Sequence, residues 1–265
     1  MDHVTGVSWP RSGHHLLVRL LKLYFGPRFV YCDFYGGIEG CCKTLPCSRA
    51  DVHLSKSHDF DLALPQVEGR KYLVQYRDFI PSIVSNWELF LLGKKPDQDT
   101  AENFYKFASG EFTGYQGFVR KWVESEFAKN QLIIHYDQIT AWPRESLRAA
   151  AEWIAPEEDV DEAAVEAAVT DVSGEKVERW KVQPLEKSGV HAGRAVEDFR
   201  HYDPARFALL ARFALRRDQV IHNYRHFFGD TPSEDHILRL QTLPDPHTLR
   251  ERLNRSDDPE SWFLP

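Results

Sequence analysis

The sequence has no apolar run near the length that a membrane-spanning helix requires, which is about 20 residues. Its first residues, Met1-Asp2-His3, have neither the basic nor the apolar region of a signal peptide, so we expect a cytoplasmic protein. Positive charge is also scarce, because 33 Lys and Arg residues face 40 Asp and Glu residues, a formal net charge of -7. The overall field therefore excludes nucleic acid and anionic membranes as expected partners, and any anion site must be local.

Cysteine is scarce and clustered. The sequence has 4 cysteines, all between Cys32 and Cys47, which are too few and too close together to form the disulfide framework of 265 residues. We expect free thiols in an irregular loop. A zinc site that joins them to His53 or His58 is the weaker alternative, because the spacing has no two Cys-x2-Cys pairs. No metal is therefore expected.

Short apolar segments alternate with longer segments of helical periodicity. This alternation is typical of an α/β fold with a mostly parallel central sheet flanked by helices. The expected strands are residues 4–9, 28–34, 51–55, 71–76 and 131–135. The expected helices follow the first and fourth strands and continue at 118–127, 144–154, 161–169 and 204–228. With no internal repeat, residues 1–265 are expected to form a single domain, with about 230–265 as a peripheral C-terminal tail.

The first expected strand runs into a tight turn before a helix. In Ser8-Trp9-Pro10-Arg11-Ser12-Gly13-His14-His15, backbone N–H groups and the positive end of a helix dipole converge. Gly13 permits close backbone approach, Ser12 adds a hydroxyl and Arg11 adds a cation. The turn is a candidate phosphate loop, and an ordinary strand-to-helix turn is the alternative. It lacks the G-x-x-x-x-G-K-[ST] pattern of nucleotide triphosphatases.

Two further groups of candidate functional residues lie at or near the ends of expected strands. Lys56 and His58 are two residues apart, so in an extended chain they point to one face, where a cation and a base suit proton removal beside a negative charge. Arg77 ends the strand 71–76, and Ser85 follows eight residues later on the next helix. Together these two side chains predict a phosphate clamp, with a surface Arg77–Asp78 pair as the alternative.

These motifs resemble those of sulfotransferases that use 3′-phosphoadenosine 5′-phosphosulfate (PAPS). The loop of that family reads Tyr-Pro-Lys/Arg-Ser-Gly-Thr/Asn-Thr, and Trp9-Pro10-Arg11-Ser12-Gly13 is similar to it. His14 and His15 replace the final pair, so only their backbone N–H contacts carry over. The family's Lys-Ser/Thr-His segment resembles Lys56-Ser57-His58. The resemblance implies a P-loop-like α/β fold.

The resemblance also implies roles for individual residues. His58 is the implied general base, and Lys56 and Arg11 are the implied stabilisers of the transferring group. Arg77 and Ser85 are implied to bind the 3′-phosphate. Leu132-Ile133-Ile134-His135-Tyr136-Asp137 resembles a family strand whose tyrosine contacts the nucleotide, which implies that role for Tyr136. The stretch Lys187-Ser188-Gly189 is similar to one that closes over the 3′-phosphate.

The function expected from the resemblance is transfer of the sulfuryl group of PAPS to a hydroxyl or amine. Adenosine 3′,5′-bisphosphate (PAP) is the expected product, and no metal takes part. A small molecule, a carbohydrate or a lipid is the expected acceptor, bound by variable loops such as 34–47 and 104–122. Two alternatives stay open. One is a nucleotide kinase or hydrolase in which Asp78 or Asp137 holds magnesium, and the other is a non-catalytic nucleotide- or protein-binding module.

Overall fold

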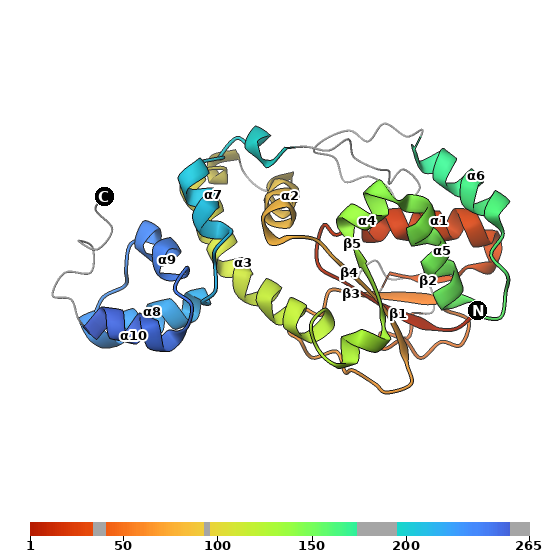
Figure 1. Cartoon of the computed structure of the whole chain (residues 1–265), viewed down its shortest axis with the longest axis horizontal. Coiled ribbons are helices and arrows are strands. Elements are labelled where there is room, and N and C mark those ends of the chain that lie inside the picture. The colour runs from red at the N-terminus through yellow and green to blue at the C-terminus, as the bar shows by residue number, and fades with distance from the viewer. Residues whose placement is uncertain (34–40, 93–95, 174–194, 255–265) are drawn as a thin grey trace. The chain divides into compact units, whose positions relative to one another are not determined.

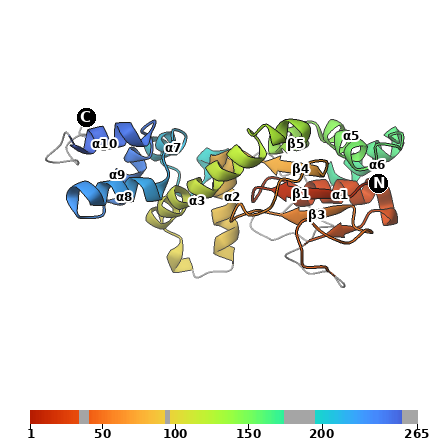
Figure 2. The ribbon, with the colours of Figure 1, turned by 90° about the horizontal axis from the view of Figure 1, so that it is seen from below.

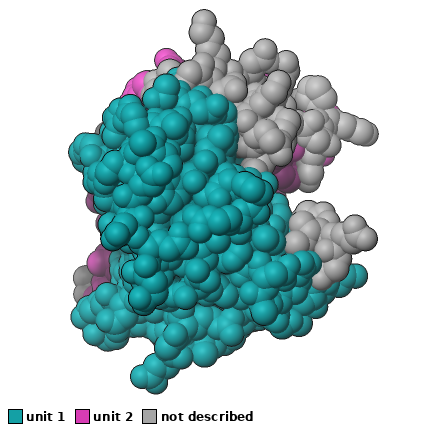
Figure 3. All heavy atoms as spheres, turned by 90° about the vertical axis from the view of Figure 1, so that its right-hand side faces the viewer, with its two compact units in different colours: residues 1–78, 117–194 teal, residues 79–116, 195–265 magenta. Residues whose placement is uncertain are grey.

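A computed structural model describes residues 1–33, 41–92, 96–173 and 195–254. The chain divides into two compact units, each built from two segments (Figure 3). Unit 1 comprises residues 1–78 and 117–194, and unit 2 comprises residues 79–116 and 195–265. The single-domain organisation expected from the sequence stays a prediction.

Unit 1 contains a five-stranded sheet in the order β2-β3-β1-β4-β5, in which every neighbouring pair is parallel. The strands are β1 (Val4–Ser8), β2 (Tyr31–Cys32), β3 (Leu54–Ser57), β4 (Lys71–Tyr76) and β5 (Leu132–His135). All five residues of β1 are buried, as a central parallel strand requires. The expected α/β class with a parallel central sheet is therefore confirmed.

One face of the sheet carries the main core of unit 1. Helices α1 (His14–Phe25), α5 (Pro143–Ile154) and α6 (Glu162–Ser173) pack together there, and Figures 1 and 2 show them beside the strands. The short helix α4 (Tyr136–Ala141) joins β5 to α5. Leu17, Leu73 and Leu147 represent this core, and all three side chains are fully buried.

The other face is covered by aromatic side chains. Tyr72, next to Leu73 in β4, points to the opposite face because successive strand residues alternate. Its ring contacts Trp122 at the end of α3 (Ala101–Trp122) and Phe127 in the 3₁₀ turn η3 (Phe127–Asn130). The helix predicted over 118–127 is confirmed in its first part only, because α3 begins at Ala101 and ends at Trp122.

Unit 2 is helical in its described residues. It contains α2 (Phe79–Leu92), residues 101–116 of α3, α7 (Pro204–Leu210), α8 (Arg217–Phe228), α9 (Glu234–Leu240) and α10 (Pro246–Asn254). Its larger core is aromatic and includes Phe104, Phe199 and Phe207. Among the helices of the described ranges, none combines the length and the apolar character that crossing a bilayer requires.

Two predictions for unit 2 are corrected by the structure. The helix expected over 204–228 is interrupted, because the N–H groups of Ala214 and Leu215 donate to the Gln241 carbonyl instead of continuing a helix. Residues 234–254 of the expected tail form α9 and α10, whose Ile237 and Leu249 are buried in a core with α8. Pro246 takes the first position of α10, where a proline is compatible with a helix.

Candidate active site

The loop between β1 and α1, residues 9–13, is held against the end of β4. The Trp9 N–H donates to the Gln75 carbonyl at 2.9 Å. The buried Ser12 hydroxyl lies 2.6 Å from the Trp9 carbonyl and 3.2 Å from the Gln75 carbonyl, and it donates to these oxygens. The hydroxyl proton of Ser12 is therefore committed to closing the loop, which leaves the backbone N–H as the donor for the predicted anion contact.

Two residues of this loop adopt a left-handed backbone, Arg11 at φ 65° and Gly13 at φ 84°. A Cβ atom on Gly13 would lie 3.1 Å from Cδ2 of Tyr136. Position 13 therefore needs glycine both for its conformation and for the close approach of the Tyr136 ring. Arg11 is exposed, and a non-glycine residue in this conformation is typical of ligand-binding loops.

Helix α1 begins directly after Gly13, its N-cap residue. No side chain makes a capping hydrogen bond at this end, and its first turn has no acidic residue. The N–H groups of a first turn have no partner within the helix, and the helix dipole adds positive potential. The geometry is suited to an anion, as the sequence predicts.

His14, the first residue of α1, is locked inside unit 1. Its Nδ1 lies 3.1 Å from Oε1 of Gln75, and its Nε2 lies 3.0 Å from the Tyr31 hydroxyl. Burial is the main cause that holds the pKa of His14 well below its usual value, so the ring is neutral. Since both ring nitrogens have protein partners, the side chain is structural, which agrees with the expectation that only its backbone could contact a ligand.

Lys56 lies in β3 and is buried, with 7% of the residue exposed. Its Nζ is 3.3 Å from Nε2 of His15 and 3.9 Å from Oδ2 of Asp33. Burial lowers the pKa of Lys56, while the Asp33 carboxylate opposes that shift. Lys56 is thus a buried cation that contacts the His15 ring, in the second residue of α1, and faces the Asp33 carboxylate.

His58 follows β3 and is half-buried. Its Nδ1 lies 2.5 Å from the backbone carbonyl oxygen of Ser8, the last residue of β1. A carbonyl can only accept, so Nδ1 carries the ring proton and the lone pair is on Nε2. Burial lowers the pKa of His58 to about 4, with a smaller contribution from the Lys56 cation, so the ring is neutral at physiological pH. A neutral ring with a lone pair on Nε2 has the form that a general base requires.

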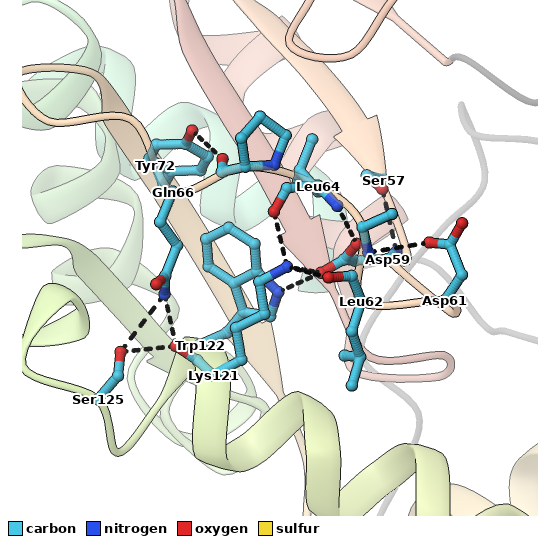
Figure 4. A network of polar contacts seen from close by, with 12 residues as sticks. Ser57, Asp59, Asp61, Leu62, Leu64, Gln66, Tyr72, Lys121, Trp122 and Ser125 are labelled. Carbon is cyan, nitrogen blue, oxygen red and sulfur yellow. Dashed lines mark hydrogen bonds and ion pairs between the residues drawn. The ribbon is translucent and has the colours of Figure 1, made fainter.

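The residue after His58 anchors the loop that follows β3. Asp59 is buried, and Figure 4 shows the contacts that converge on it. Its Oδ2 accepts from Lys121 Nζ at 2.7 Å and from Trp122 Nε1 at 2.7 Å, and its Oδ1 accepts from the Leu64 N–H at 2.7 Å. The carboxylate thus joins its own loop to the end of α3.

The same lysine holds the loop at two more points. Lys121 Nζ donates to the carbonyl oxygens of Leu62 at 2.7 Å and Leu64 at 2.6 Å. Asp59 adopts φ 47°, a left-handed conformation that this network stabilises. Because Asp59 directly follows His58, the network fixes the backbone that carries the candidate base.

Arg77 and Tyr136 meet at the ends of β4 and β5. The guanidinium carbon of Arg77 lies 4.0 Å from the centre of the Tyr136 ring, a cation–π contact that orients the arginine. Two residues predicted to contact the nucleotide thus lie together. Ser85 is a half-buried residue of α2, in unit 2, so the clamp that joins it to Arg77 stays a prediction from the sequence.

Three potential metal ligands also gather near this edge. In the described part of the chain, ligand atoms of Asp78, His135 and Asp137 all lie within 4.8 Å of one another. Nδ1 of His135 accepts from the Asp137 N–H at 3.3 Å, and Nε2 lies 3.4 Å from Oδ1 of Asp78. Both carboxylates are exposed, and the two histidine nitrogens face different carboxylates.

The strand ends therefore bring most of the predicted residues to one edge of the sheet. Lys187, Ser188 and Gly189 lie outside the described residues. The sequence did not reveal Gln75 or Tyr31, although a glutamine within an otherwise apolar strand is a usable signal for a buried polar partner. No local signal points from Asp59 to Lys121, because the two residues are distant in sequence.

The fold and the site define an α/β protein with a candidate anion loop between the central strand and the first helix. No known family profile and no curated protein matches the sequence. Solved structures do match it, among them the crystal structure of mouse sulfotransferase SULT7A1 in complex with PAP. The two chains share 16% sequence identity with a TM-score of 0.51, and the match covers 77% of this chain and 80% of that one. The chain thus has a sulfotransferase fold.

Proposed function

We propose that this protein transfers the sulfuryl group of PAPS to a hydroxyl or amine of an acceptor, with His58 as general base. The observation that carries the proposal is the bond from His58 Nδ1 to the Ser8 carbonyl. Ser8 ends β1 and directly precedes the loop 9–13. The base and the candidate anion site are thus tied to the same short stretch of backbone.

The residues around the loop fit a phosphorylated nucleotide. The uncapped start of α1 offers N–H donors at Gly13, His14 and His15, and Arg11 adds a cation in the same loop. Arg77, oriented by Tyr136, is the proposed ligand of the 3′-phosphate, where a guanidinium forms two parallel hydrogen bonds. Ser85 and the segment 187–189 are proposed to complete this phosphate site from the resemblance alone.

The roles at the reacting centre follow from charge. Sulfuryl transfer parallels phosphoryl transfer, in which negative charge develops on the oxygen that leaves. Lys56 and Arg11 are the cations proposed to stabilise that charge. His58 accepts the acceptor's proton at Nε2 and contributes roughly 10²–10⁴-fold in rate. The acceptor is proposed to be a small molecule, a carbohydrate or a lipid.

The decisive experiment measures turnover and nucleotide binding separately. With radiolabelled PAPS and a panel of acceptors, wild-type protein should form a sulfated product. His58→Ala should lose roughly 10²–10⁴-fold in rate, while its dissociation constant for PAP, measured by calorimetry, stays close to wild type. A rate like that of wild type in this variant would remove His58 from the mechanism. PAP binding without turnover of any acceptor would instead favour the non-catalytic binding module.

The nucleotide site is tested with Arg77→Ala. This variant should bind PAP more weakly because it loses a cation aimed at the 3′-phosphate. Arg28→Ala is the matched control, since Arg28 lies beyond the C-terminal end of α1 and is exposed in an ion pair with Glu158. An unchanged dissociation constant in Arg77→Ala would contradict the assignment.

A second candidate function rests on the group Asp78, His135 and Asp137. Two carboxylates at the strand ends could serve a nucleotide kinase or hydrolase that uses magnesium, an ion that prefers oxygen ligands. Turnover of ATP that depends on magnesium and is lost in Asp78→Asn would support this function. Absence of such turnover in a protein that binds PAP would exclude it.

A further inference from the structure

The four cysteines between residues 32 and 47 form two pairs of free thiols. The sulfurs of Cys32 and Cys41 lie 3.8 Å apart, and those of Cys42 and Cys47 lie 3.4 Å apart. In the ranges that the structure describes, the group of three potential metal ligands within 4.8 Å consists of other residues. The sulfurs therefore form pairs rather than one tetrahedral centre.

Hydrogen-bond donors point at the sulfur of Cys42, which also lies 3.7 Å from the Thr44 carbonyl oxygen. The Thr44 hydroxyl donates to its sulfur at 3.1 Å and the Ser48 N–H donates at 3.4 Å. Donors that point at a sulfur stabilise the thiolate. These bonds, with that of Thr44 the largest contribution, lower the pKa of Cys42 to about 5. Cys42 is half-buried, so its sulfur is also accessible.

Cys47 has the opposite environment. It is buried, with 3% exposed, in an apolar cluster with Cys32 and Val52. Burial raises the pKa of Cys47, so this thiol keeps its proton and donates it toward the Cys42 sulfur. The two members of the pair are therefore a thiolate and a thiol in contact.

The charged side chains of this loop do not account for the thiolate. Lys43 is exposed, and its backbone N–H donates to Cys41 rather than to Cys42. Arg49 forms an ion pair with Asp51 at 2.5 Å. The Thr44 hydroxyl and the Ser48 N–H both point at the Cys42 sulfur, whereas Cys41 accepts from the Lys43 N–H alone among the backbone and hydroxyl donors described for it.

We propose that Cys42 is a nucleophilic thiol that exchanges with small-molecule disulfides, and that Cys47 is its resolving thiol. In the first step the Cys42 thiolate attacks one sulfur of oxidised glutathione, forms a mixed disulfide and expels one glutathione thiolate. In the second step Cys47 passes its proton to the glutathione thiolate released in the first step and attacks the Cys42 sulfur. The Cys42–Cys47 disulfide forms, and the second glutathione leaves as a thiolate. One thiolate and one thiol of the protein are oxidised to a disulfide, and one glutathione disulfide is reduced to one thiol and one thiolate.

The first test needs no substitution. Full-length reduced protein is alkylated with iodoacetamide at pH 6 and pH 8, and each cysteine is quantified by peptide mass spectrometry. Cys42 should react at nearly the same rate at both values, whereas an ordinary thiol of pKa about 8.5 slows by on the order of 10²-fold at pH 6. A slowing of that size at Cys42 would overturn the proposal.

The second test follows the exchange. Oxidised glutathione should convert wild-type protein to the Cys42–Cys47 disulfide, and Cys47→Ser should instead accumulate the glutathione adduct at Cys42. Cys42→Ser should form neither product, while Cys41→Ser, the matched control, should react like wild type. Adducts that appear first at Cys32 or Cys41 would contradict the assignment of Cys42 as the nucleophile.

The donor itself is tested at Thr44. Thr44→Val removes the hydroxyl that donates to Cys42, so alkylation of Cys42 at pH 6 should slow at least several-fold. Thr44→Ser keeps a hydroxyl and should retain the wild-type rate. Equal rates in both variants would show that the Thr44 hydroxyl does not activate Cys42.

Discussion

The loop after β1 and the loop after β3 both carry candidate catalytic residues, but different contacts hold them. The loop 9–13 is fixed locally, by a hydrogen bond from Trp9 and by the Ser12 hydroxyl, both to acceptors at its own ends or on the neighbouring strand β4. It also requires a glycine at position 13. Its contacts use backbone carbonyls and short side chains.

The loop 58–64 is fixed by a buried ion pair. Asp59 binds Lys121 and Trp122 at the end of α3, and Lys121 also binds the carbonyls of Leu62 and Leu64. An ion pair of this kind is costly to break, because removing one partner leaves the other charge without compensation. The loop that carries the base thus depends on side chains of a helix distant in sequence, whereas the candidate anion loop depends on its own residues and on a backbone carbonyl of β4.

The largest expected effect comes from breaking the anchor of the second loop. Asp59→Ala should lower the free energy of unfolding by about 3–5 kcal/mol, because it leaves Lys121 and the Trp122 N–H without their carboxylate. Asp61→Ala is the matched control, since Asp61 is exposed and accepts only from the Ala63 N–H among the bonds described for it. Urea unfolding measures both, and the control should stay within about 0.5 kcal/mol of wild type. Equal stability of the two variants would show that the ion pair does not anchor the loop.

A smaller effect is expected from Gly13→Ala in the first loop. Gly69→Ala is the matched control for backbone strain alone, because Gly69 has φ 76° and a Cβ there meets nothing within 4 Å. It should cost about 1–2 kcal/mol. Gly13→Ala adds the contact with Tyr136 and should cost about 1–3 kcal/mol more. If the two variants unfold at the same urea concentration, the close packing of Tyr136 has no energetic weight.

The hydroxyl that closes the first loop should matter less. Ser12→Ala loses the bonds to the Trp9 and Gln75 carbonyls and should cost about 1 kcal/mol, the usual worth of a neutral hydrogen bond. Its affinity for PAP should stay near that of wild type, because the backbone N–H of residue 12 is retained. A large loss of affinity measured by calorimetry would assign the hydroxyl to the ligand instead.

The response of His58 to pH has no effect on stability at neutral pH and grows as the pH falls. Its pKa is lowered from 6.5 to about 4, so below pH 6.5 the unfolded chain takes up a proton before the folded chain does. This group therefore lowers stability as the pH falls from 6.5 to about 4 and has no effect above 6.5. An NMR titration of the ring in nucleotide-free protein should give a midpoint near 4. A midpoint near 6.5 would contradict the burial of the ring, which is the main cause of the low pKa.

The sequence predicted the parts of the fold that depend on local pattern. The strand Lys71–Tyr76 is confirmed, because a short run of apolar residues reads directly as a buried strand. The strand predicted over 51–55 begins and ends too early, since β3 covers Leu54–Ser57. The polar residues of β3 are buried between neighbouring strands. Burial of Ser55 and Lys56 depends on tertiary packing, which periodicity does not reveal.

The candidate site also has a part that the sequence predicted from local pattern and a part that depends on tertiary packing. Arg11, Ser12 and Gly13 could be identified because a loop between a strand and a helix places its backbone at the helix start. The groups that hold His58 and its loop in place could not be identified from the sequence. Ser8 supplies a backbone carbonyl to His58, and a carbonyl has no sequence signature. Lys121 binds Asp59 across a long sequence separation, and a lysine near a helix end is usually solvated.

The burial of His58 affects how the base is regenerated after the proposed reaction. Burial lowers the pKa of the ring to about 4, although the Ser8 carbonyl and, to a smaller degree, the Asp33 carboxylate oppose that shift. The imidazolium that forms on proton uptake is therefore a stronger acid than an ordinary imidazolium. It should pass its proton quickly to water or buffer once the product leaves. In the reaction that we propose, loss of this proton should not limit turnover, so the turnover rate should not depend on the concentration of buffer.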